Sequence, residues 1–167
     1  MKQTRVDYCM HRRVLVKEAS MTNHLTIVPT FPEPQLHVVT WPDEVLDHLG
    51  HDPLSDYVEV FWVSVLGPTA TLLVRRLAKQ LAANPAGYTI NCADWAKELG
   101  IGDKGGKNSP FWRSVERACR FGAARRNGAI LAVRPKLPPL TIRQLNRLPI
   151  HMRTIHTEWD GPAEATA

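Results

Sequence analysis

A helix that runs directly into a β-hairpin, over residues 109–133, is the feature that most limits how this chain can fold. The side chain of Ser109 can accept backbone N–H groups and Pro110 tolerates the first helical position, so we predict a helix that begins at Pro110. Gly122 can end this helix in the left-handed conformation. Apolar residues recur along it at three- and four-residue spacing and predict a buried face made of Phe111, Val115, Ala118 and Cys119, with Trp112 beside them.

The opposite face of this helix carries three arginines, Arg113, Arg117 and Arg120, at positions i, i+4 and i+7. That spacing aligns the three guanidiniums along one exposed ridge. Only Glu116 interrupts the positive charge. Such a ridge is usually a solvated surface, but it also suits contact with nucleic acid, and both interpretations stay open at this point.

The hairpin is predicted from Asn127-Gly128, which stands between the short runs 123–125 and 129–133. Asn-Gly between two such runs favours a tight turn, because the turn requires residues that tolerate a positive φ. Arg125 and Arg126 directly precede it. We therefore expect a basic tip that projects away from the core and buries nothing.

Upstream of this unit, apolar periodicity and chain-breaking residues predict further regular elements. They are helices over residues 42–49, 55–66, 69–83 and 93–99, and a short edge strand over 87–91. Downstream, Thr141 and Gln144 predict a capping box at the start of a C-terminal helix, and an apolar stripe continues as far as Trp159. Helices of that kind pack against their own domain or dimerise, and both outcomes stay open.

Residues 93–101, Ala-Asp-Trp-Ala-Lys-Glu-Leu-Gly-Ile, resemble the first helix of a helix-turn-helix, in which Leu-Gly-Ile leads to the recognition helix. With the helix and hairpin that follow, the resemblance covers residues 69–133. It is to the winged helix-turn-helix DNA-binding superfamily, and loosely to small bacterial proteins of this shape. One departure is the turn from Gly100 to Asn108, where the pattern allows three or four residues. This turn is either a basic loop that orders on phosphate or a spacer.

The resemblance implies a mainly α (α+β) fold, a winged helix-turn-helix with an N-terminal helical extension and a C-terminal helix. Its second helix would enter the major groove of DNA, and its hairpin, the wing, would contact the backbone or the minor groove. The expected organisation is an N-terminal arm over residues 1–40, partly irregular with a short strand at 36–39, a winged-helix domain with flanking helices over 41–159, and a frayed tail over 160–167.

The function implied is sequence-dependent binding of double-stranded DNA by a transcription regulator. The residues expected to contact DNA lie in the loop, the helix and the wing, and are Lys104, Lys107, Asn108, Ser109, Arg113, Ser114, Arg117, Arg120, Arg125, Arg126 and Asn127. The alternative is a protein-protein interaction module built on the same fold, which apolar residues on the ridge or wing would favour. An RNA-binding accessory protein would need exposed aromatic residues interleaved with the basic ones, and the sequence shows no such pair.

The charge distribution supports a polyanion partner. The chain has a net charge of +5, and residues 100–159 hold 12 Lys or Arg against three acids, whereas residues 1–99 hold 9 basic and 11 acidic residues. The excess positive charge therefore lies in the same half as the helix and the hairpin. Neutralising phosphates with such a surface releases condensed counterions, which favours nucleic acid as the partner, with a homodimer through the N- or C-terminal helices as an open addition.

The location expected for this chain is the cytoplasm. No apolar run approaches the roughly 20 residues of a membrane-spanning helix, and the N-terminus lacks the apolar core of a signal peptide. We therefore expect no membrane partner. Cys9, Cys92 and Cys119 form no Cys-x-x-Cys pair and predict reduced thiols.

No catalytic or metal-binding pattern emerges from the sequence. The cluster around His48 and His51 matches no closed zinc spacing. Gly106-Lys107 is not a phosphate-binding P-loop, because Ile101 stands where that motif needs glycine. We expect no cofactor, no metal and no enzyme activity.

Overall fold

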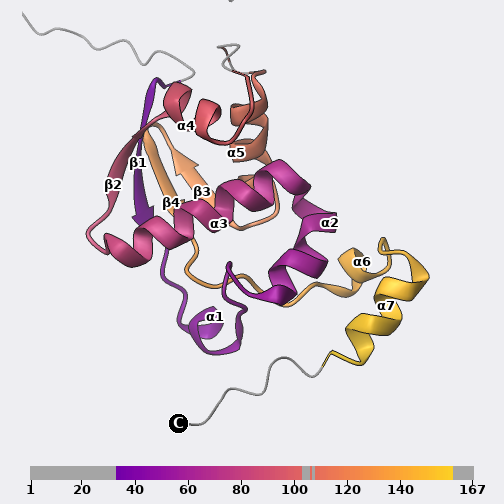
Figure 1. The fold of residues 1–167 in the computed structure, drawn as a ribbon. Coiled ribbons are helices and arrows are strands. Elements are labelled where there is room, and N and C mark those ends of the chain that lie inside the picture. Colours follow the sequence, from indigo (N-terminus) through magenta and orange to yellow (C-terminus); the bar gives the residue numbers. More distant parts are fainter. Residues whose placement is uncertain (1–32, 103–105, 107, 160–167) are drawn as a thin grey trace, which may run out of the picture.

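The computed structural model describes residues 33–102, 106 and 108–159, which form an α+β fold (Figure 1). In chain order the elements are β1 (Gln35–Thr40), α1 (Glu44–Leu49), the π-helical segment η1 (Val58–Trp62), α2 (Val63–Leu66), α3 (Pro68–Ala83), β2 (Tyr88–Asn91), α4 (Cys92–Glu98), α5 (Pro110–Arg120), β3 (Ala124–Asn127), β4 (Ile130–Val133), α6 (Ile142–Leu145) and α7 (Ile150–Thr157). The helices predicted over 42–49, 69–83 and 93–99 are confirmed to within two residues, and the one predicted over 55–66 is present as η1 followed by α2, with its start three residues later. Helix α3 begins at Pro68, where the missing N–H costs no hydrogen bond.

The sheet has the strand order β2-β1-β4-β3. Strand β1 pairs antiparallel with β2 and parallel with β4, and β3 and β4 form an antiparallel hairpin. The short strand predicted at 36–39 is therefore confirmed, and it lies inside the sheet. This part of the expected N-terminal arm belongs to the folded unit. Strand β2 lies at an edge, as predicted.

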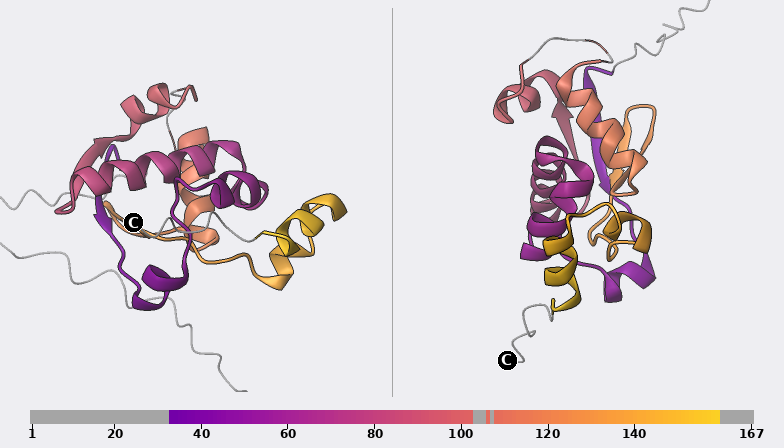
Figure 2. Two further views of the ribbon diagram at one scale, coloured as in Figure 1. Left: turned by 60° about the horizontal axis from the view of Figure 1, so that its bottom comes forward. Right: turned by 90° about the vertical axis from the view of Figure 1, so that its right-hand side faces the viewer.

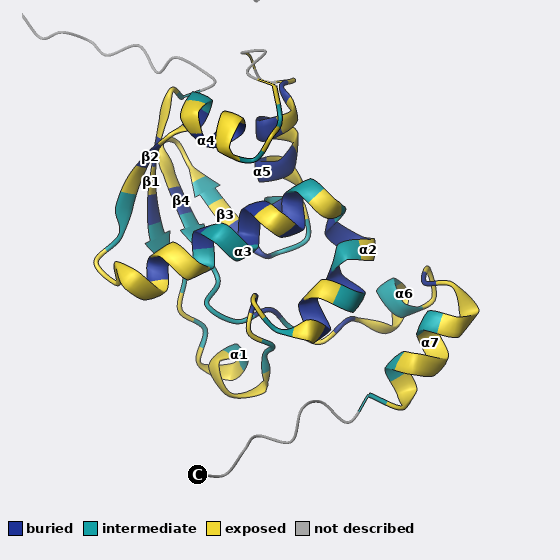
Figure 3. Ribbon diagram, viewed as in Figure 1, coloured by how far each residue is buried: buried dark blue, intermediate teal, exposed yellow. Residues whose placement is uncertain are grey.

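The core lies between one face of the sheet and the helices packed on it. Helix α3 contacts β1 and β4, and α5 contacts β3, so both helices cover the same face (Figures 1 and 2). Leu36 and Val38 of β1 point into this layer and are fully buried, together with Phe61 and Trp62 of η1. The burial colours follow the same division, with dark blue on the facing sides of α3 and α5 and yellow over most of α1 and α7 (Figure 3).

The turn of the hairpin differs from the prediction by one position. Strand β3 continues through Asn127, which pairs with Ile130, so the two turn residues are Gly128 and Ala129. Gly128 has φ 57°, a value that residues with a side chain rarely adopt, and this explains glycine at the turn. Arg126 consequently lies within a strand and not at the tip.

The end of α7 and the residues just after it pack against Tyr57 and Phe61 through an aromatic cluster. The capping box predicted for Thr141 and Gln144 is present at the start of α6. In α7, Nε2 of His156 lies 2.9 Å from the hydroxyl of Tyr57, and the ring of Phe61 meets the ring of Trp159 edge-on at 5.2 Å. The end of the predicted apolar stripe therefore packs within the same chain. Among the described residues, no helix is both long and apolar enough to cross a membrane.

Candidate nucleic-acid interface

Helix α5 begins and packs as its sequence predicts. The Ser109 hydroxyl accepts the backbone N–H of Trp112 at 3.3 Å, and the Ser114 hydroxyl donates to the carbonyl of Pro110 at 2.9 Å. Both serines are buried, Ser109 with 8% and Ser114 with 6% of its surface exposed. The prediction that these two serines lie on the DNA-facing surface is therefore wrong, because their hydroxyls stabilise the first turns of the helix.

The three arginines of α5 are exposed, but they do not form one uniform ridge. Arg117 is directed back onto the protein, where its Nε and Nη2 donate to the carbonyl of Val65 at 3.2 and 2.7 Å. That carbonyl belongs to the last turn of α2, which lacks an intrahelical partner for it. Arg113 lies beside Arg117, over a shallow hollow at the start of α3.

Arg120 lies on the other side of α5, where the helix and strand β3 enclose an open cleft of about 770 Å³. The cleft is lined by Trp41, Trp112, Val115, Glu116, Cys119, Arg120, Ala124, Arg125 and Arg126. Three guanidiniums and a single carboxylate among these residues make the lining basic. We call this site the α5–β3 cleft.

Arg125 and Arg126 reach the cleft from opposite faces of β3, because successive side chains of a strand alternate. Arg125 is exposed, and its Cζ lies 5.3 Å from the ring centre of Trp41. Arg126 is half-buried on the helix side, and its Cζ lies 5.0 Å from the ring centre of Trp112. The prediction of a hairpin tip that buries nothing is therefore wrong for Arg126, since its guanidinium is packed against the core.

Trp41 is the residue of this site that sequence reasoning missed. It follows β1 directly, and its backbone N–H donates to the carbonyl of Val133 at 2.8 Å. The guanidinium of Arg134 covers its ring, with Cζ 3.9 Å from the ring centre. Only the parallel pairing of β1 with β4 brings Trp41 to the hairpin, and no local pattern in the sequence signals that pairing.

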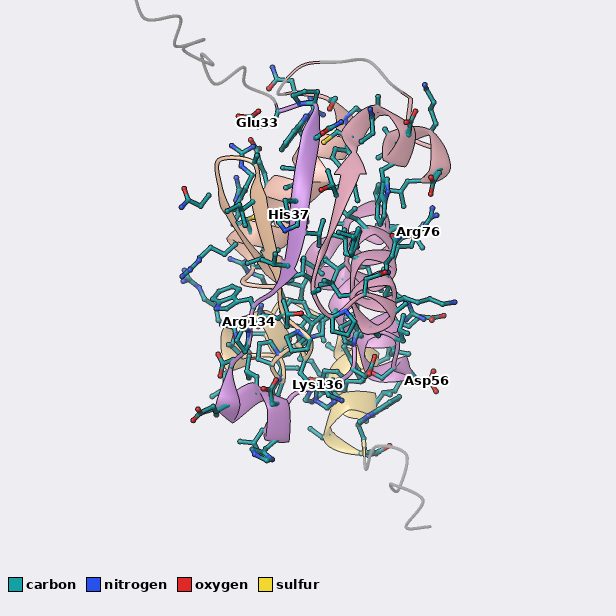
Figure 4. The ribbon with its side chains drawn as sticks, turned by 90° about the vertical axis from the view of Figure 1, so that its left-hand side faces the viewer. Glu33, His37, Asp56, Arg76, Arg134 and Lys136 are labelled. Carbon is teal, nitrogen blue, oxygen red and sulfur yellow. The ribbon has the colours of Figure 1, made fainter. Side chains whose placement is uncertain are left out.

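Arg134 is held in place by two further contacts. Its Nε donates to the carbonyl of Gly122 at 2.9 Å, and its Nη1 forms an ion pair with Asp43. The hydrogen bond from Arg134 is the main reason that the pKa of Asp43 is lowered from its ordinary value. In Figure 4, Arg134 lies on the opposite side of the sheet from Arg76 of α3. The Trp41 ring is thus fixed from the side of the sheet that α3 leaves open.

The cysteine in the cleft is not an activated nucleophile. Burial raises the pKa of the Cys119 thiol, and it raises the pKa of Cys92 to about 11. Both thiols therefore stay protonated near neutral pH. What the α5–β3 cleft presents is positive charge and aromatic rings.

The remaining predicted contact residues are placed as follows. Asn108 and Asn127 are exposed, at the start of α5 and at the end of β3. Lys104 and Lys107 lie outside the described residues. The structure therefore groups Arg120, Arg125 and Arg126 in one site.

Comparisons with known proteins identify no relative. No protein-family model matches the chain, and no curated protein or solved structure matches it significantly. The α5–β3 cleft and its surroundings are therefore interpreted from their own chemistry.

Proposed function

We propose that this protein binds double-stranded DNA through α5 and the β3–β4 hairpin, as a winged helix-turn-helix protein that regulates transcription. The element order α3-β2-α4-α5-β3-β4 supports this proposal, since it is the order helix, strand, helix, helix and hairpin of that fold. The fold departs from that pattern by placing β1 between β2 and β4. This extra strand leaves the hairpin beside α5.

The observation that carries the proposal is the shared basic cleft between α5 and β3. A helix that lies in the major groove and a wing beside it must leave room for the phosphate backbone between them. Arg120 and Arg125 stand on the two sides of such a gap, and Arg113 extends the positive surface along α5. Arginine binds phosphate oxygens in a bidentate manner, which suits this position.

The experiment that tests the proposal is a gel-shift titration against a pool of random duplexes at several salt concentrations. The double variant Arg113→Ala, Arg120→Ala should lower duplex affinity and reduce the salt slope by about two, because two phosphate contacts are lost. Lys79→Ala, which removes an exposed cation from α3, is the control and should leave the slope unchanged. No binding by the parent protein, or equal slopes for all three proteins, would exclude the proposed interface.

A second candidate function is a protein-interaction module, and exposed apolar side chains favour it. Ile142 of α6 is 78% exposed and Ile150 of α7 is 76% exposed, and Ile130 of the hairpin is also exposed. Isoleucines this open to solvent at the end of a folded unit suit a contact with a second copy or another protein. Sedimentation velocity over a range of concentrations tests it, since Ile142→Ser with Ile150→Ser should abolish any dimer of the parent protein.

A further inference from the structure

The α5–β3 cleft contains an aromatic ring that the binding of duplex DNA does not require. Phosphates need only the guanidiniums, yet the cleft also places the half-buried ring of Trp41 next to Arg125. Trp112 is only 4% exposed and lies under Arg126, so it supports the floor of the cleft. Trp41 is therefore the ring that a ligand can reach.

The two arginines at Trp41 differ in how firmly they are held. Arg134 lies 3.9 Å from the ring centre and is anchored by Gly122 and Asp43. Arg125 lies farther away, at 5.3 Å, and among the described residues its guanidinium contacts the ring without a hydrogen bond. Arg125 can therefore shift to admit a flat group, whereas Arg134 keeps the indole in place.

We infer that the α5–β3 cleft binds an unpaired nucleotide of a single-stranded nucleic acid, with the base stacked against Trp41 and Arg125 and the phosphate near Arg120. Single-strand sites combine a basic groove with aromatic rings on which bases stack, and arginine planes also stack on bases. In a duplex the bases are paired and stacked on one another, so Trp41 would have no base to contact. The inference rests on the proposed function in taking nucleic acid as the partner.

The charge and size of the cleft agree with this ligand. Three guanidiniums outnumber the single carboxylate of Glu116, which leaves a net positive lining for a phosphodiester. The cleft is open, and its volume of about 770 Å³ is comparable with the roughly 300 to 1,000 Å³ of sites that bind small organic groups. A strand of DNA and a strand of RNA offer the same base and phosphate, so the test includes both.

The test measures fluorescence anisotropy of labelled 12-nucleotide strands, dT12 and rU12, and of a 12-base-pair duplex, with the full chain. Trp41→Leu keeps an apolar side chain but removes the aromatic face, and should weaken single-strand binding about tenfold or more. Trp41→Phe keeps an aromatic ring, and this variant should therefore keep most of the single-strand affinity of the parent protein. Thermal denaturation followed by circular dichroism checks that both variants are folded.

An arginine pair provides a control that does not alter the ring. Arg125→Gln should also weaken single-strand binding about tenfold, because it removes both a stacking plane and a charge. Arg153→Gln removes an equal charge from an exposed position of α7, away from the cleft, and should weaken single-strand binding no more than about threefold. An equal loss of affinity for dT12 and rU12 in the two variants would overturn the inference, because it would show that binding depends only on the net charge of the protein.

The duplex separates this inference from the proposed function. Duplex binding without binding of dT12 or rU12 overturns the cleft inference and leaves the proposed function standing. Single-strand binding that depends on Trp41, without duplex binding, supports the cleft inference and overturns the duplex proposal. Single-strand affinity that is the same in the parent, Trp41→Leu and Trp41→Phe proteins overturns the inference, whatever the duplex does.

Discussion

At the scale of single residues, Arg117 shows how a surface arginine can serve the fold. Its two donors satisfy the carbonyl of Val65 at the end of α2. Hydrogen bonds from a charged group to a carbonyl contribute about 1 to 2 kcal/mol, so Arg117→Ala should lower Tm by roughly 3 to 6 °C in thermal denaturation. Arg113→Ala, the same change on the same helix, is the control. If both variants have the same Tm, the hydrogen bonds from Arg117 to α2 do not stabilise the fold.

Arg126 is a second residue whose position changes its expected role. Because its guanidinium packs over the ring of Trp112, we expect Arg126→Ala to destabilise the fold by about 1 to 2 kcal/mol, the range of a largely desolvated cation–π contact. Arg125→Ala, at the exposed neighbouring position, should lower the free energy of unfolding by less. Chemical denaturation of the two variants measures the difference. A smaller loss for Arg126→Ala than for Arg125→Ala would contradict the packing described here.

At the scale of elements, the attachment of α7 depends on Tyr57 and the rings around it. The imidazole of His51 stacks on the Tyr57 ring at 3.5 Å, and Tyr57 also accepts the N–H of Leu140 at 2.9 Å. Burial is the main reason that the pKa of His51 is lowered from its ordinary value near 6.5, with smaller repulsion from His156 and Lys136. The neutral imidazole is therefore the form that fits the cluster.

This lowered pKa predicts how stability changes with pH. Below about 6.5 the unfolded chain binds a proton at His51 that the folded chain does not, so the free energy of unfolding should fall as the pH drops below that value. His51→Phe keeps a ring on Tyr57 and should flatten this part of the pH profile of Tm. His48→Phe, at an exposed position of α1, should leave the profile as it is in the parent. A parent-like profile in His51→Phe would assign the effect to another group.

The elements that the sequence predicts well are those with strong local signals. Ser109-Pro110 marks the start of α5, Thr141 with Gln144 marks the start of α6, and Gly128 marks the hairpin turn. Whether an exposed-looking side chain folds back is not a local property. Arg117 and Arg126 occupy positions that periodicity assigns to solvent, and their partners, Val65 and Trp112, become neighbours only through packing.

At the scale of the whole molecule, β1 connects the hairpin to the rest of the sheet. Val38→Asp should prevent folding or lower Tm by more than about 10 °C, because Val38 is fully buried and a carboxylate there loses its hydration without a partner. His37→Asp, on the exposed face of the same strand, is the matched control. Far-ultraviolet circular dichroism during heating measures both. A Val38→Asp protein with the same Tm as the His37→Asp protein would contradict the burial of Val38 in the core.

The candidate site was predictable from the sequence only in part, for the same long-range reason. The basic residues of α5 and β3 lie close together in the chain, and local patterns place them together. Trp41 and Arg134 come from the ends of β1 and β4, and their contact requires a parallel pairing that no turn signal announces. The contact between Trp41 and Arg134 could therefore be found only from the structure and not from the sequence.

The position of β1 also governs when the protein can fold during its synthesis. His37 pairs with Ile130, so one side of β1 has no strand to pair with until the hairpin has left the ribosome. Contacts this distant in sequence require a long loop to close and slow the folding reaction. A nascent chain that stalls before residue 130 would expose an unpaired strand edge, the kind of surface on which chains aggregate and chaperones act. Both the stability of the sheet and the completion of the basic cleft therefore wait for the same late segment of the chain.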